Sequence, residues 1–147
     1  MFNPSREEVR QFFVGAWSKR RLQQPVEPLE QVAIEWIQEH PEYHPVLEHP
    51  DAIHLDFPVE QGQSNPFLHL SMHLSLSEQM SIDQPPGIRS ALTALAARKG
   101  SLHEAMHLAM EALGEMLWES QRSGLAPDPQ RYIDQLLRWS AGDRIGP

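Results

Sequence analysis

Apolar residues recur every three or four positions along most of this chain, which is the spacing of one face of a helix. In the first such segment, Ser5 and Glu8 form a capping box, and the apolar stripe then runs to about Leu22. A second stripe runs from about Pro28 to His40 and stops before Pro41. Three more helices are predicted towards the C-terminus, at about 88–98, 101–122 and 128–139.

The stretch 41–64 breaks this pattern, because it is rich in proline and histidine. Its prolines exclude a long helix, although one helical turn fits through 46–49. Residues 53–59 alternate between apolar and polar, a weak strand signal that Pro58 weakens further. We expect an irregular segment whose apolar side chains pack against the helices.

The stretch 65–83 supports two interpretations. Strict alternation of apolar and polar residues from Leu68 to Ser77 is typical of a half-buried strand. Asn65 followed by Pro66 is instead typical of a helix start, and the residues that follow are not β-branched. We favour a helix, and the strand over 67–77 stays open at this point.

Together these segments predict a mainly α fold, a single-domain bundle of about five or six helices over residues 1–140. Residues 141–147 are expected to be a frayed tail. The helix at 101–122 carries Gly114 on its histidine-bearing face, which predicts a close approach to another helix there.

Composition narrows the class of protein. The 147 residues are 40% hydrophobic and 22% charged, as in a soluble globular protein, and no apolar run could span a membrane. Twenty acidic against 12 basic residues give a net charge of −8, which argues against a nucleic-acid partner. The N-terminus does not resemble a signal peptide, and there is no cysteine, so we expect a cytoplasmic protein.

Histidines carry the candidate chemistry. His69 and His73 are four residues apart, as are His103 and His107, and residues four apart on a helix lie on one side of it, separated by about 40°. Two such pairs on facing helices would direct four imidazoles to one point. Other residues could complete such a site: Glu111 one turn beyond His107, and His40 or His44 from the second helical segment.

Imidazole is a common ligand of zinc, iron, nickel and copper, so the first hypothesis is a transition-metal site, with zinc or iron as the ion. The second hypothesis is a non-catalytic structural or interaction module. Its core histidines would form a hydrogen-bonded network without metal, and its surface would bind a partner protein or a second copy. The sequence contains no phosphate-binding glycine loop, no G-x-S-x-G motif and no H-E-x-x-H motif, so it names no reaction.

Several motifs are similar to those of one protein family. They are H-P-E-Y-H-P at 40–45, N-P-F-L-H-L-S-M-H-L-S-L-S-E-Q at 65–79, D-Q-P-P-G-I-R at 83–89 and the segment H-E-A-M-H-L-A-M-E-A-L-G-E-M-L-W-E-S-Q-R-S-G at 103–124. With them the chain resembles the bacterial domain-of-unknown-function family numbered 1841 over nearly its whole length. The resemblance implies a small, single-domain bacterial protein and brings no established activity.

Overall fold

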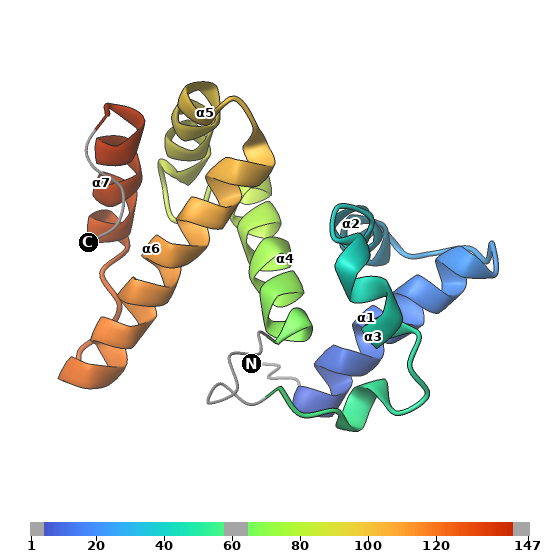
Figure 1. The fold of residues 1–147 in the computed structure, drawn as a ribbon. Coiled ribbons are helices and arrows are strands. Elements are labelled where there is room, and N and C mark those ends of the chain that lie inside the picture. Colours follow the sequence, from blue (N-terminus) through green and yellow to red (C-terminus); the bar gives the residue numbers. More distant parts are fainter. Residues whose placement is uncertain (1–4, 58–64, 143–147) are drawn as a thin grey trace. The chain divides into compact units, whose positions relative to one another are not determined.

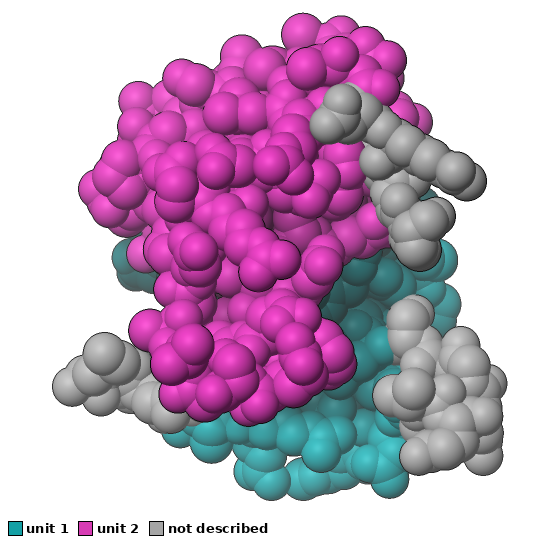
Figure 2. Space-filling model, turned by 90° about the vertical axis from the view of Figure 1, so that its left-hand side faces the viewer, with its two compact units in different colours: residues 1–74 teal, residues 75–147 magenta. Residues whose placement is uncertain are grey.

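The computed structural model describes residues 5–57 and 65–142, and these residues form helices and no strand (Figure 1). The mainly α prediction is therefore confirmed. The chain divides into two compact units, residues 1–74 and 75–147, each considered separately below (Figure 2). Whether the two units make one domain, as the sequence analysis expects, stays a prediction.

The N-terminal unit begins with two helices, α1 (Arg6–Arg21) and α2 (Pro28–Gln38), that pack against each other. Helix α1 starts at the predicted capping box: the Ser5 hydroxyl accepts from the Glu8 N–H, and the Glu8 carboxylate accepts from the Ser5 N–H. The inward faces of both helices bury large apolar side chains, including Phe13, Ile34 and Ile37. The 3–4 spacing thus predicted both helices, but Leu29, part of the apolar stripe of α2, is 52% exposed, whereas Ile34, outside that stripe, is buried.

The proline- and histidine-rich segment folds into three short elements, η1 (Pro41–Tyr43), α3 (His44–Leu47) and η2 (Ala52–His54). The helical turn expected through 46–49 lies two residues earlier, and because α3 adds an element, the described residues contain seven α-helices rather than five or six. Residues 53–57 form no strand with another segment among the described residues. Pro58 and Val59, part of the weak strand signal, lie outside them.

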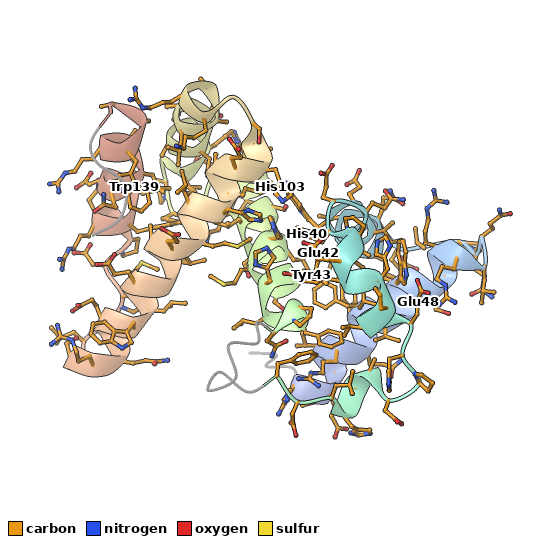
Figure 3. All side chains as sticks on the ribbon, in the orientation of Figure 1. His40, Glu42, Tyr43, Glu48, His103 and Trp139 are labelled. Carbon is orange, nitrogen blue, oxygen red and sulfur yellow. The ribbon has the colours of Figure 1, made fainter. Side chains whose placement is uncertain are left out.

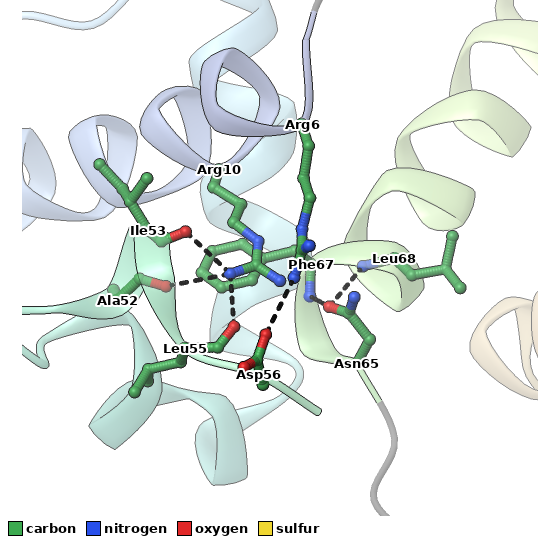
Figure 4. Close-up of polar contacts among 9 residues, drawn as sticks. All are labelled: Arg6, Arg10, Ala52, Ile53, Leu55, Asp56, Asn65, Phe67 and Leu68. Atoms are coloured by element: carbon green, nitrogen blue, oxygen red, sulfur yellow. Dashed lines mark hydrogen bonds and ion pairs between the residues drawn. The ribbon is translucent and has the colours of Figure 1, made fainter. Parts of the chain in front are cut away.

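Arg10 of α1 holds η2 in place (Figure 4). Its side chain is 1% exposed, and Nη1 donates to the carbonyls of Ile53 at 2.9 Å and Leu55 at 2.7 Å, with Ala52 at 3.5 Å. The guanidinium also lies over the ring of Phe67, 4.9 Å from its centroid. Burial, more than the nearby Arg6, lowers the pKa of Arg10 from its ordinary value. In an irregular segment, few backbone N–H groups are placed to donate to its carbonyl oxygens. Here the guanidinium of one buried arginine donates to them instead.

Helix α4 (Pro66–Ile82) resolves the ambiguity at 67–77 in favour of a helix. Its start is the predicted one, since Asn65 Oδ1 accepts from the N–H groups of Phe67 at 2.9 Å and Leu68 at 3.2 Å (Figure 4). The strict alternation therefore did not indicate a strand: Leu70, His73 and Leu76 recur at 3–3 spacing and are all fully buried. The boundary between the two units falls within this helix, after Leu74.

The C-terminal unit contains α5 (Ile88–Lys99), α6 (Leu102–Ser123) and α7 (Pro129–Ser140), which pack side by side (Figure 1). Helices α5 and α6 end at Gly100 and Gly124, both with positive φ, as glycine C-caps do. The core is mostly aliphatic and aromatic: Leu92, Leu95, Ala105, Met106, Ala109, Ile133, Leu136 and Trp139.

Helix α6 corrects one expectation. A Cβ built on Gly114 meets nothing within 4 Å, so none of the described helices approaches closely there. Leu117 and Trp118, which continue the apolar stripe of this helix, are 44% and 57% exposed. The periodic stripe continues past the end of the packed region, so periodicity alone does not mark where burial stops. The frayed tail was predicted for 141–147, of which 143–147 lie outside the described residues.

Candidate metal centre

Three imidazoles meet inside the N-terminal unit. His40 follows α2, and His69 and His73 lie one turn apart on α4. The ring centroids are 4.9 Å apart for His40 and His69 and 4.8 Å for each of the other two pairs. His40 and His73 are buried, and His69 is partly buried. The predicted i,i+4 pair is thus joined by the third histidine that the sequence suggested from the second helical segment.

A backbone carbonyl sets the tautomer of His40. Its Nδ1 lies 2.7 Å from the carbonyl oxygen of Trp36. A carbonyl only accepts hydrogen bonds, so Nδ1 carries the proton and donates. In the neutral ring Nε2 then has the lone pair, and the Nε2 of His69 lies 3.2 Å from it. His69 therefore donates from Nε2 to His40. This arrangement, with the outer ring nitrogen on a backbone carbonyl, is the usual support of a metal-binding histidine.

Aromatic side chains surround these imidazoles. The indole of Trp36 stacks on His73, with ring centroids 4.1 Å apart and an interplanar angle of 18°. Tyr43 stacks on His40 at 5.2 Å and 3°, and Figure 3 shows these two residues side by side. Burial, with a smaller effect of Glu42, raises the pKa of the Tyr43 phenol. Flat apolar surfaces limit the access of water and hold the rings in fixed orientations.

The second predicted pair lies in the C-terminal unit. His103 and His107 sit in the first turns of α6, both partly buried, with their Nε2 atoms 3.1 Å apart. Their ring centroids are 4.4 Å apart. The i,i+4 spacing by itself brings these two nitrogens together, as the sequence predicted.

Other candidates lie elsewhere. His44 stacks on Trp17, with centroids 4.4 Å apart, and its Nε2 lies 3.0 Å from the Ile37 carbonyl, to which it donates. Glu111 is exposed on α6. His49 and His54, which no site hypothesis included, are exposed as well.

Two aromatic residues of the site, Trp36 and Tyr43, were not predicted from the sequence. Trp36 belonged to an apolar stripe and was expected only to fill the core. The sequence did contain one signal. The last carbonyls of a helix have no N–H partner within the helix, and Trp36, four residues before His40, provides such a carbonyl when the helix ends before Pro41. Tyr43 lies within the H-P-E-Y-H-P run, between two histidines that both became buried or half-buried.

The described residues thus define a class: a helical protein with three imidazoles gathered in its N-terminal unit, those of His40, His69 and His73, and a histidine pair on α6 in its C-terminal unit. The chain belongs to the family described as Domain of unknown function (DUF1841), whose model matches residues 5–138. No curated protein and no solved structure was found to match it. Among the described residues, no helix has the length and apolar character needed to cross a membrane.

Proposed function

We propose that this protein binds one transition-metal ion in its N-terminal unit, through nitrogens of His40, His69 and His73. The observation that carries the proposal is the tautomer of His40. Its Nδ1–H is held by the Trp36 carbonyl, so the lone pair of Nε2 points into a group of other imidazoles. Metals bind the deprotonated nitrogen of a neutral imidazole, so this ring is already in the form that a metal needs.

Distances within each unit support the proposal. Two nitrogens that bind one tetrahedral ion at about 2.05 Å lie about 3.3 Å apart. The Nε2 atoms of His103 and His107 are 3.1 Å apart, and those of His40 and His69 are 3.2 Å apart. Each unit therefore presents nitrogens at the separation that chelation requires, and an ion would need only small side-chain movements. While no metal is bound, the hydrogen bond from His69 to His40 keeps these two Nε2 atoms at this separation.

The donors favour zinc. They are all imidazole nitrogens, the chain has no cysteine, and Zn²⁺ accepts three such ligands with water in the fourth position, without a redox demand. Iron sites commonly add a carboxylate. Glu111 is the acidic residue that the sequence offers for this role, and its exposed position on α6 makes iron the second choice.

Elemental analysis of untagged full-length protein, followed by zinc titration, tests the proposal. We expect about one ion per chain. Substituting His40, His69 or His73 by Ala should weaken binding by more than the roughly 10–100-fold typical of outer-shell residues. His54→Ala, an exposed histidine, is the matched control and should bind as the wild type does. Less than about a tenth of an equivalent, with no uptake on titration, would refute metal binding.

His103→Ala and His107→Ala test the histidine pair of the C-terminal unit separately. Both variants should bind zinc as the wild type does. Loss of binding in these two variants, with His40→Ala and His73→Ala unaffected, would show that the proposed site is wrong.

A second candidate is a metal-free histidine network. The Nε2 separations of 3.2 and 3.1 Å also fit N–H···N hydrogen bonds, which the tautomer of His40 permits. In that case the imidazoles specify the packing of α2 against α4, and the protein is a structural or interaction module. Protein purified without metal that keeps its full stability and takes up no zinc would favour this second function.

A further inference from the structure

A cleft opens in the C-terminal unit, and none of its lining residues is a histidine. It has a volume of about 360 Å³ and lies between the last turns of α6 and the first turns of α7. Its apolar lining includes Met116, Leu125, Pro127 and Tyr132, and Leu125 is 72% exposed. A hollow with apolar walls and a large exposed aliphatic side chain is a common form of protein-binding site.

The rim of this cleft is acidic. Glu115, Glu119 and Asp128 line it, against the single cation Arg131. Glu119 pairs with Arg122 at 2.6 Å, and Asp128 Oδ1 accepts from the Arg131 N–H to cap α7. Glu115 is exposed and has no ion pair among the described residues. Glu115 and Glu119 are four residues apart on α6, so they repel each other, and a cation from outside would relieve this cost.

The N-terminal unit carries a surface of opposite character, at the end of α1. Lys19, Arg20 and Arg21 are consecutive, and Leu22, the next residue, is 64% exposed. Lys19 is bound to Glu30 at 2.9 Å, whereas Arg21 lies 3.9 Å from Glu48. Arg20 is exposed and makes no ion pair within the described part of the chain. An exposed apolar residue thus directly follows two exposed arginines in the sequence at the end of α1.

We propose that Leu22, Arg20 and Arg21 of one copy bind the acidic cleft of a second copy. Leu22 would enter the apolar hollow, and the two guanidinium groups would reach Glu115 and Glu119. We choose a second copy as the binding partner because of charge complementarity. The cleft is acidic, and in a chain of net charge −8, residues 19–21 are the one dense basic run. The two surfaces differ, so this contact is head-to-tail and can extend from copy to copy.

The association is independent of the metal proposal and depends on salt. Arginine–carboxylate contacts at an exposed rim are screened within about 8 Å at physiological ionic strength. The association constant should therefore fall several-fold between low salt and about 0.5 M salt. A contact driven by apolar burial alone would not weaken in this way.

Sedimentation of the full-length protein tests the proposal, with a chelator present so that histidine-bound metal cannot link copies. We expect the weight-average mass to rise with protein concentration at low salt and to return to that of the monomer at high salt. A chain that stays monomeric at every concentration and salt would overturn the proposal.

A charge exchange makes the test specific. Arg20→Glu/Arg21→Glu places acid against an acidic cleft, and Glu115→Lys/Glu119→Lys places a basic cleft against the basic end of α1. Each double variant alone should be monomeric, and their equimolar mixture should associate again, because each then meets an opposite charge. Glu35→Lys/Glu78→Lys changes the charge by the same amount at exposed sites outside both surfaces, and it should associate as wild type does. Self-association of either double variant, or no association of the mixture, would show that these surfaces do not meet.

Discussion

The two units differ in which groups donate hydrogen bonds to their backbone carbonyls. In the C-terminal unit, the regular helices satisfy most of their own backbone, and α5 and α6 end at glycine caps. In the N-terminal unit, the segment 41–57 is irregular, and buried side chains donate to its carbonyls and to those of α2. Arg10 donates to the Ile53 carbonyl of η2, His40 donates to the Trp36 carbonyl, and His44 donates to the Ile37 carbonyl.

This difference explains the two kinds of histidine group. His103 and His107 meet because they are one turn apart on α6, which the sequence spacing alone determines. His40 and His69 meet because α2 packs near α4, and the orientation of His40 is set by a carbonyl. A histidine that already donates from Nδ1 has only Nε2 left for chemistry. The imidazole of His40 therefore has two roles: Nδ1 holds the ring in place on the Trp36 carbonyl, and Nε2 faces the other histidine.

The largest effect is expected from Arg10→Ala. The change removes charge-assisted hydrogen bonds to the carbonyls of Ile53 and Leu55 and leaves a buried hollow. We expect a loss of about 4 kcal/mol in the free energy of unfolding, measured by urea denaturation. Amide exchange should quicken mainly in residues 5–57. Arg138→Ala, an exposed arginine of α7, is the control and should cost no more than about 0.5 kcal/mol. A loss below about 1 kcal/mol for Arg10→Ala would mean that η2 does not depend on this side chain.

Leu95→Ala makes the matching test in the C-terminal unit. Leu95 is fully buried between helices, with no polar role. Its truncation should cost about 3 kcal/mol through lost burial and the cavity that remains. Exchange should quicken mainly in residues 75–142, the reverse of the Arg10 result. Leu137→Ala, at a site 42% exposed, should cost much less. Equal acceleration in both units for either variant would show that they unfold together.

Two glycines of α6 should respond with opposite signs. Gly124 has φ +74°, a conformation that costs other residues about 1 kcal/mol, so Gly124→Ala should be destabilising. Gly114 lies inside the helix, and an added Cβ meets no described atom within 4 Å. Gly114→Ala should therefore stabilise the protein by about 0.5–1 kcal/mol. Thermal melting of both variants measures these effects. If Gly114→Ala proved destabilising, the result would support the close helix approach at Gly114 that the sequence suggested.

Local signals made most of the fold predictable. Caps at Ser5, Asn65, Ser101 and Asp128 each accept the expected backbone N–H, because such bonds join residues two or three apart. The i,i+4 histidine pairs are local for the same reason. The rest depends on contacts between distant residues. Arg10 lies in a polar turn of α1, where an arginine is usually exposed. Its neighbours in sequence do not indicate that η2, more than 40 residues later, covers it.

The smallest effect concerns Asp83, the polar side chain that organises the turn between α4 and α5. Its Oδ1 accepts from the N–H groups of Arg89 at 3.0 Å and Gly87 at 3.3 Å, and Arg89 in turn donates to the Met80 and Ser81 carbonyls. The bond from the Arg89 N–H is the main cause that lowers the pKa of Asp83 below its ordinary value. The charged carboxylate therefore stabilises the folded state at neutral pH, and the effect should disappear as the pH falls below about 4 and the group is protonated.

Asp83→Asn removes this titration, so the wild type should melt at a higher temperature near neutral pH, with the difference shrinking below about pH 4. Thermal melts at a series of pH values measure it, and Glu78→Gln, an exposed acid on the preceding helix, is the control. A difference that stays constant down to about pH 2 would assign the effect of Asp83 to turn geometry rather than to its charge. The C-terminal unit would then have no charged side chain at this turn whose role matches that of Arg10 in the N-terminal unit, and the contrast between the two units would become sharper.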